Sequence, residues 1–211
     1  PQEAAAQPAL APAAPAATPS LVIQHVRIFD GVRDTLRNGS VLVLGDTIAK
    51  VSATAIVPPP GSQVIDGGGR ILMPGLIDAH WHMVHASNSS FSSKKTDPGL
   101  MYAHAVAEAE RTLLRGFTTV RDVGGPTFGL KEAIDSGVIP GPRVFPSGAT
   151  LSRPTGADGP SSVFANVGAF AVAKDASDVV TTARAQLEKG ASQIQVGIGD
   201  SGDPVGDRLQ D

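Results

Sequence analysis

A repeating order of strand, loop and helix after Arg70 is the feature that most limits what this chain can fold into. Four units are predicted, with strands over 71–82, 117–122, 143–147 and 192–196 and helices over 100–115, 128–136 and 177–189. Gly116, Gly137 and Gly190 stand where these helices stop. The alternation predicts an α/β fold with a parallel sheet, because each helix carries the chain back to the start of the next strand.

The number of units predicts part of a closed barrel. An eight-unit barrel of about 250 residues uses roughly 31 residues per unit, so the stretch from Arg70 to Asp211 holds about four and a half units. We therefore expect residues 70–211 to form the N-terminal half of a (β/α)8 TIM-type barrel. Because such a half leaves a sheet edge uncovered, it is expected to need a C-terminal half or a second copy of the chain, as in a homo-oligomer.

Two different segments precede these units. Residues 1–20 contain almost only Ala, Pro, Gln and Ser, which predicts a disordered, extended leader. Leaders of this composition often follow a removed signal peptide, so we expect export to the periplasm or out of the cell, with an arbitrary chain start as the alternative. Residues 21–69 contain short β-type runs, which predict a small antiparallel β layer, over 21–29, 40–44, 47–51 and 63–66.

Composition excludes several classes of function. The chain has 17 Lys and Arg against 20 Asp and Glu, a net charge of −3, so no positive field attracts nucleic acid. No window approaches about 18 consecutive apolar residues, so no membrane span is expected. Because the chain has no cysteine, any metal would be held by His, carboxylate or a modified side chain.

His80 and His82 are the residues with the clearest chemistry. Side chains alternate along a strand, so both imidazoles are predicted on one face and Trp81 on the other, packed against an outer helix. At the C-terminal end of a barrel strand, this placement supplies two nitrogen ligands to a divalent metal ion. A His-x-His pair alone is a weak signal, and packing or surface roles are the alternative.

Around this pair the sequence resembles the amidohydrolase superfamily. The strings that carry the likeness are VLVLGDTIAKV, PGLIDAHWHM, LLRGFTTVRDVGG and GLKEAIDSGVIPGPRVFPSGA. The likeness is strongest to bacterial enzymes related to Xaa-Pro dipeptidases and imidazolonepropionases, a group that includes hydrolases of N-acyl amino acids and of ochratoxin. It implies a metal-dependent hydrolase of an amide or peptide bond in a small N-acyl amino acid or dipeptide-like substrate, with one or two divalent ions, zinc first among them.

The resemblance also implies roles for single residues. His80 and His82 would be the metal ligands from the first barrel strand. Asp78 would be a supporting residue that orients one of these imidazoles without binding the metal itself. Gln195 stands where the family carries a carboxylated lysine that bridges two metals; glutamine cannot form a carbamate, and its amide oxygen is a neutral, weaker ligand. The family's catalytic aspartate is expected beyond Asp211, so no catalytic residue is assigned within the chain.

Two further interpretations stay open. A non-catalytic, truncated or degenerate half-barrel that acts as a folding or interaction module is favoured by Gln195 and by the absence of histidine from the loop over 151–168. A mononuclear, deaminase-type amidohydrolase is suggested by Gln195 alone, because one deaminase branch carries glutamine there. Asp122 is expected to act as an N-cap or turn residue beside Gly124 and Gly125, with a hydrogen bond near the metal site as the alternative.

Overall fold

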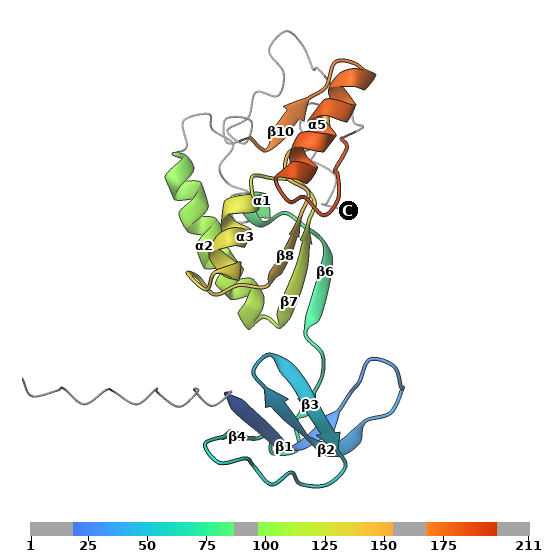
Figure 1. The fold of residues 1–211 in the computed structure, drawn as a ribbon, viewed down its shortest axis with the longest axis vertical. Helices are drawn as coiled ribbons and strands as arrows, with labels where there is room; N and C mark the ends of the chain where they lie inside the picture. Colours follow the sequence, from blue (N-terminus) through green and yellow to red (C-terminus); the bar gives the residue numbers. More distant parts are fainter. Residues whose placement is uncertain (1–18, 87–96, 154–167, 198–211) are drawn as a thin grey trace, which may run out of the picture. The chain divides into compact units, whose positions relative to one another are not determined.

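The computed structural model describes residues 19–86, 97–153 and 168–197 of the chain (Figure 1). The chain divides into two compact units, Pro1–Pro74 and Gly75–Asp211, and each is described by itself. The leader expected over residues 1–20 lies, apart from its last two residues, outside the described residues. Within the described residues, no helix is both long and apolar enough to cross a membrane.

The first unit is a five-stranded mixed sheet. Its strands are β1 (Ser20–Ile28), β2 (Arg37–Leu44), β3 (Thr47–Ser52), β4 (Gln63–Asp66) and β5 (Ile71–Leu72). The order is β3-β2-β1-β4, and β5 also pairs with β1. The prediction of a purely antiparallel layer is wrong, because β4 and β5 both run parallel to β1. Residues 53–62, which include three consecutive prolines, connect β3 to β4 without a tight hairpin and so deliver β4 in the parallel sense.

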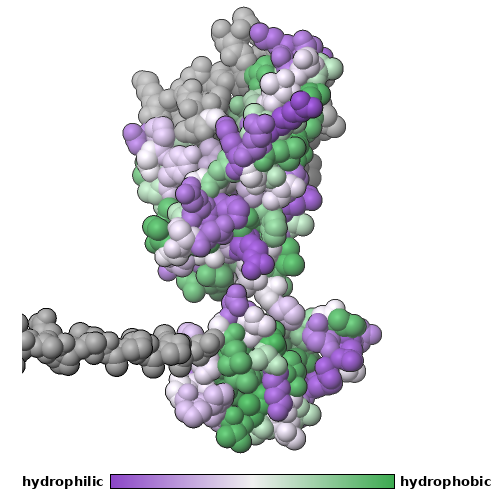
Figure 2. Space-filling model, viewed as in Figure 1, coloured by the Kyte–Doolittle hydropathy of each residue, from purple (hydrophilic) through white to green (hydrophobic). Residues whose placement is uncertain are grey.

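One face of this sheet is apolar and only partly covered within the described residues. Cross-strand partners place on it the side chains of Leu21, Ile23, Val41, Val43, Ile48, Val51 and Ile65. Of these, Ile48 is 65% exposed and Val51 54% exposed, whereas Val22 on the opposite face is fully buried. Figure 2 shows apolar residues on the surface of this unit. Val41 on the same face is buried, at 5% exposed, so this face is covered at Val41 and open along β3.

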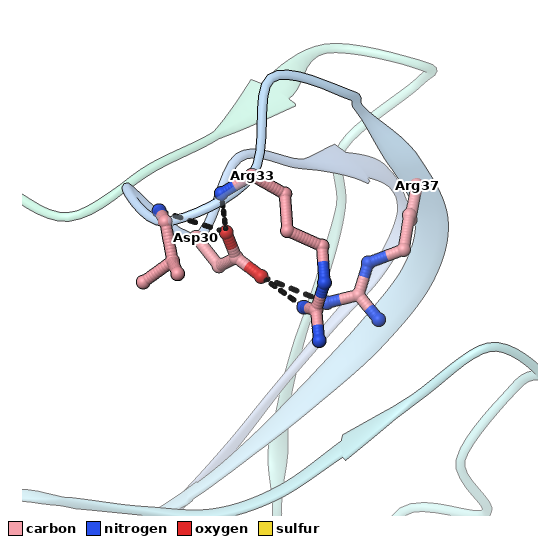
Figure 3. Close-up of polar contacts among 4 residues, drawn as sticks. Asp30, Arg33 and Arg37 are labelled. Carbon is pink, nitrogen blue, oxygen red and sulfur yellow. Dashed lines mark hydrogen bonds and ion pairs between the residues drawn. The ribbon is translucent and has the colours of Figure 1, made fainter.

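A single carboxylate organises the turn after β1. Asp30 accepts hydrogen bonds of 3.0 Å from the backbone N–H groups of Val32 and Arg33, and its other oxygen accepts from the guanidinium groups of Arg33 and Arg37 (Figure 3). The backbone donors of Arg33 and Val32 are the main reason that the pKa of Asp30 is lowered to about 2, and the Arg33 side chain adds to them. The turn is therefore held by the ionised form of Asp30.

We predict that this turn is acid-sensitive. Because the pKa of Asp30 lies below its ordinary value of 3.8, the carboxylate stabilises the folded turn above about pH 4, and that contribution is lost as the pH falls through about 2. NMR titration of the Asp30 carboxyl carbon should give a midpoint near 2. Arg33→Gln should raise this midpoint only part of the way, since both backbone donors remain. A midpoint at the ordinary value in the unchanged protein would contradict the prediction.

The second unit is built on three parallel strands, β6 (Leu76–Trp81), β7 (Phe117–Asp122) and β8 (Arg143–Pro146), in the order β6-β7-β8. Its helices are the short α1 (Met83–Ala86), α2 (Pro98–Leu114), α3 (Phe128–Asp135) and α5 (Ala176–Glu188). The three long helices begin and end within two residues of the predicted bounds. Asp97 and Asp175 cap α2 and α5 with their carboxylates, as expected of N-cap residues. The predicted α/β class with a parallel sheet is thus confirmed.

The core of this unit lies between the sheet and its helices. Val120 and Val144 from the sheet pack with Met101, Ala105 and Ala109 from α2, and the cluster also contains Met83, Val84 and Leu130. Trp81 packs against the same cluster, as predicted. In Figure 1, α2 and α3 lie on the same side of β7 and β8. The core of this unit is therefore formed by the sheet together with α2 and α3.

The first predicted strand, over 71–82, is in fact two strands in two different sheets. β5 pairs with β1 in the first unit, and β6 pairs with β7 in the second. Pro74 and Gly75 separate them, because proline has no N–H to donate and glycine favours a change of direction. The division of the chain after Pro74, rather than at the expected position near Arg70, follows from the pairing of β5.

The fourth predicted strand, over 192–196, is also different. It forms one isolated parallel bridge, between Leu151 and Val196, instead of a regular strand. The Gln193 side chain donates hydrogen bonds to the carbonyls of Asp122 and Phe145, so this segment is held by a side chain at the ends of β7 and β8. The predicted loop after β8 contains β9 (Thr150–Ser152), which pairs in parallel with β10 (Phe170–Val172), and residues 154–167 between them lie outside the described residues.

Candidate functional site

His80 and His82 come together at the C-terminal end of β6. Their ring centroids are 5.2 Å apart and their planes meet at 75°. His80 is exposed and His82 is half-buried, while Trp81 between them packs toward the core. The two rings are therefore neighbours, although His82 follows the last residue of β6. Metal binding by the pair stays a prediction.

The surroundings of His82 favour a neutral imidazole. Burial is the largest cause that lowers the pKa of His82, and the nearby His80 lowers it further, while Gly124 and Asp78 act in the opposite direction. The Nδ1 atom lies 3.4 Å from the carbonyl oxygen of Gly124, which can only accept a hydrogen bond. Nδ1 must therefore carry the proton when this bond forms, and Nε2 then carries the lone pair that a metal ligand needs.

Asp78 contacts the main chain rather than a ring. Its Oδ1 atom accepts a hydrogen bond of 2.9 Å from the backbone N–H of His80. Among the described residues, no hydrogen bond joins Asp78 to an imidazole, so its expected role in orienting a ring stays a prediction. The carboxylate therefore holds the backbone at His80 and acts on His82 through its charge, which raises the pKa of that ring.

Gln195 lies in the segment beside β9. Its carbonyl oxygen accepts a hydrogen bond of 2.9 Å from the backbone N–H of Leu151. In the part of the chain that the structure describes, no hydrogen bond joins its side chain to either histidine. The same residues contain no group of three or more His, Cys, Asp or Glu side chains that could hold a metal ion. The assignment of Gln195 as a ligand therefore stays a prediction.

Asp122 proves more central than its sequence context suggests. The residue is fully buried at the end of β7, and its Oδ2 atom accepts a hydrogen bond of 2.7 Å from the backbone N–H of Met83, next to His82. Its Oδ1 atom accepts a weaker one, of 3.3 Å, from Gly124, which is the expected turn contact. The expected N-cap role is wrong, because Thr127 occupies the N-cap position of α3. Burial raises the pKa of Asp122 to about 7, against the opposing effect of these backbone donors.

Comparison with known proteins then decides the family. The model of the amidohydrolase family matches residues 71–204, a stretch that contains the whole candidate site. This chain belongs to the amidohydrolase family. The resemblance carried by the His-x-His string and its neighbours is thereby confirmed.

Individual relatives of this amidohydrolase chain are hydrolases by name. The chain is 27% identical over 191 residues to ochratoxinase from Aspergillus niger, covering 80% of this chain and 40% of the relative. It is 39% identical over 71 residues to imidazolonepropionase from Ralstonia nicotianae, covering 33% of this chain and 17% of the relative. A solved prolidase in complex with N-methylphosphonate-L-proline has a TM-score of 0.71 and 29% identity, over 84% of this chain and 46% of that one. The chain thus spans less than half the length of each.

Proposed function

We propose that this chain is part of a metal-dependent hydrolase that cleaves an amide or peptide bond in a small N-acyl amino acid or dipeptide-like substrate. The observation that carries the proposal is the pair of imidazoles at the C-terminal end of β6, 5.2 Å apart, where barrel enzymes of the parallel type place their active sites. The names of the relatives support the substrate class, since ochratoxinase and a prolidase are among them.

The residues present fit a divalent ion. His82 is kept neutral by its surroundings, and its contact with Gly124 selects the Nδ1–H tautomer, so the chemistry of the donor set suits zinc. A divalent ion bound at such a site supplies a water of lowered pKa and polarises a carbonyl group. His80 and His82 would hold the ion, Asp78 would fix the backbone at His80, and the proton transfers would need a further acid–base residue.

Two imidazoles fill only half of a tetrahedral coordination shell. We therefore propose that the three parallel strands are part of a (β/α)8 barrel, and that a C-terminal half or a second copy supplies the remaining ligands and the catalytic aspartate. The short coverage of the relatives supports the first of these sources. We also propose that the ion is zinc. Export of the protein is a further part of the proposal, motivated by the Ala/Pro-rich residues 1–18, which lie outside the described residues.

Metal analysis and substrate hydrolysis test the proposal together. The intact protein, purified without chelators, should contain a divalent metal and should release free amino acid from N-acyl amino acids or Xaa-Pro dipeptides. A chelator should remove both metal and activity, and added Zn²⁺ should restore them. Release of ammonia from a heterocyclic ring instead would favour the deaminase alternative suggested by Gln195. A protein without metal and without hydrolytic activity would contradict the proposal and favour the interpretation as a non-catalytic folding or interaction module.

A further inference from the structure

Strand pairing alone does not fix the part of β6 that carries the histidines. The β6–β7 ladder pairs Asp78 with Val120 and Trp81 with Asp122, and its register is irregular between these two pairs. His80 lies inside this irregular stretch, and His82 follows the last residue of the strand. A metal site needs its ligands held within narrow limits. Some other group must therefore hold this end of β6 in place.

Asp122 is placed to do this from the neighbouring strand. Its carboxylate is fully buried and accepts a hydrogen bond of 2.7 Å from the backbone N–H of Met83, the residue after His82. The backbone N–H of Val123 adds a 2.9 Å hydrogen bond to the carbonyl of Trp81, the residue before His82. The backbone on both sides of His82 is thus tied to the end of β7.

The same carboxylate also holds the group that contacts the His82 ring. Gly124 donates its N–H to Asp122 and offers its carbonyl oxygen to His82 Nδ1, at 3.4 Å. Gly124 has a φ of +143°, and a Cβ there would lie 2.5 Å from Thr150 Oγ1 and 3.7 Å from the His82 ring. The positive φ and the short distance to Thr150 Oγ1 require glycine at this position, while the His82 ring lies at an ordinary contact distance.

We infer that Asp122 is a positioning residue for His82: its buried carboxylate binds the backbone after the histidine and the turn that orients the ring. The inference rests on the proposed function, because it assigns a use to the orientation of a metal ligand. Outer partners that orient ligating histidines typically contribute about 10- to 100-fold to metal affinity. Asp122 touches neither substrate nor metal in this role and acts through His82.

Asp122→Asn tests the inference with little change in shape. Met83 donates to Oδ2 of Asp122 and Gly124 donates to Oδ1, and an asparagine has an NH2 group, which cannot accept, in place of one of these oxygens. In the intact protein we expect Zn²⁺ to bind about 10- to 100-fold more weakly, measured by competition with a chelator. Asp135→Asn, which makes the same change at an exposed ion pair with Lys131 on α3, is the matched control and should bind Zn²⁺ as the unchanged protein does. An Asp122→Asn protein that binds Zn²⁺ with unchanged affinity would overturn the inference.

A second measurement needs no metal, and its decisive outcome comes from the unchanged protein. In metal-free protein at about pH 8, where an imidazole is neutral, NMR of ¹⁵N-labelled histidine identifies which ring nitrogen carries the proton. We expect the proton of His82 on Nδ1 in the unchanged protein and a mixture of tautomers in Asp122→Asn. A proton on Nε2 in the unchanged protein would overturn the inference. Failure of the unchanged protein to bind Zn²⁺, with the Nδ1 tautomer present, would instead count against the proposed function.

Discussion

His82→Ala is expected to abolish zinc retention by the intact protein and, with it, amide hydrolysis. The substitution removes one of the two imidazoles, whose ring centroids are 5.2 Å apart. It also removes the Nε2 atom, which carries the lone pair when Nδ1 donates to Gly124. Loss of an outer partner costs about 10- to 100-fold in affinity, so loss of a direct ligand should cost at least the upper part of that range. Isothermal titration with Zn²⁺ and metal analysis after gel filtration measure the effect.

His25→Ala is the matched control for this experiment. His25 lies in the first unit, is exposed, and pairs with Asp66 at 3.1 Å, so the same chemical change is made away from the site. Zinc content and activity should be unchanged in this variant. His80→Ala should behave as His82→Ala does. Full zinc retention in both His80→Ala and His82→Ala would show that the ion, if present, is held elsewhere.

Gly148→Ala is expected to cause a large loss of stability in the second unit. Gly148 is buried with a φ of +71°, which costs a residue with a Cβ about 1–2 kcal/mol. The added Cβ would also meet Gln186 Oε1 and lie 2.7 Å from the Phe128 ring, and such overpacking costs about 1–3 kcal/mol. Because Gln186 Oε1 accepts from the N–H of Ala149, the clash would also loosen α5. We expect a total of about 2–5 kcal/mol.

Two other glycines separate the causes. Gly137 has a φ of +74° and open space around its Cβ position, so Gly137→Ala should show the backbone cost alone, about 1–2 kcal/mol. Gly129 lies inside α3 with open space and no positive φ, so Gly129→Ala should stabilise by about 0.4–1 kcal/mol. Equilibrium urea unfolding of the three variants gives the comparison. Equal losses for Gly148→Ala and Gly137→Ala would rule out a packing role for Gly148.

Most of the local structure could be predicted because its causes are local. The capping aspartates Asp97 and Asp175 and the glycines that follow each helix act within a few residues, so the bounds of α2, α3 and α5 agree with the sequence pattern. The period of two likewise predicted that the imidazoles of His80 and His82 are neighbours, and their ring centroids are 5.2 Å apart. The strings around them were enough to identify the superfamily.

The errors arise where partners come from distant parts of the chain. The stretch over 71–82 reads as one strand, but β5 and β6 find different sheets on the two sides of Pro74. Residues 192–196 have the composition of a strand, yet the Gln193 side chain, bonded to carbonyls at the ends of β7 and β8, holds them in place of a regular ladder. The pairing of a strand depends on which sheet edges are available to it, and the local sequence pattern does not contain this information.

The amino-acid order by itself determined which residues could bind an ion and that they would lie on the same side of a strand. Only the tertiary structure decided how they are held. Met83 and Asp122 are 39 positions apart, and His82 and Gly124 are 42 apart, so a pattern with a period of two or 3.6 residues carries no information about either contact. These contacts form because the pairing of β6 with β7 brings the ends of the two strands together, where a buried carboxylate must find backbone donors.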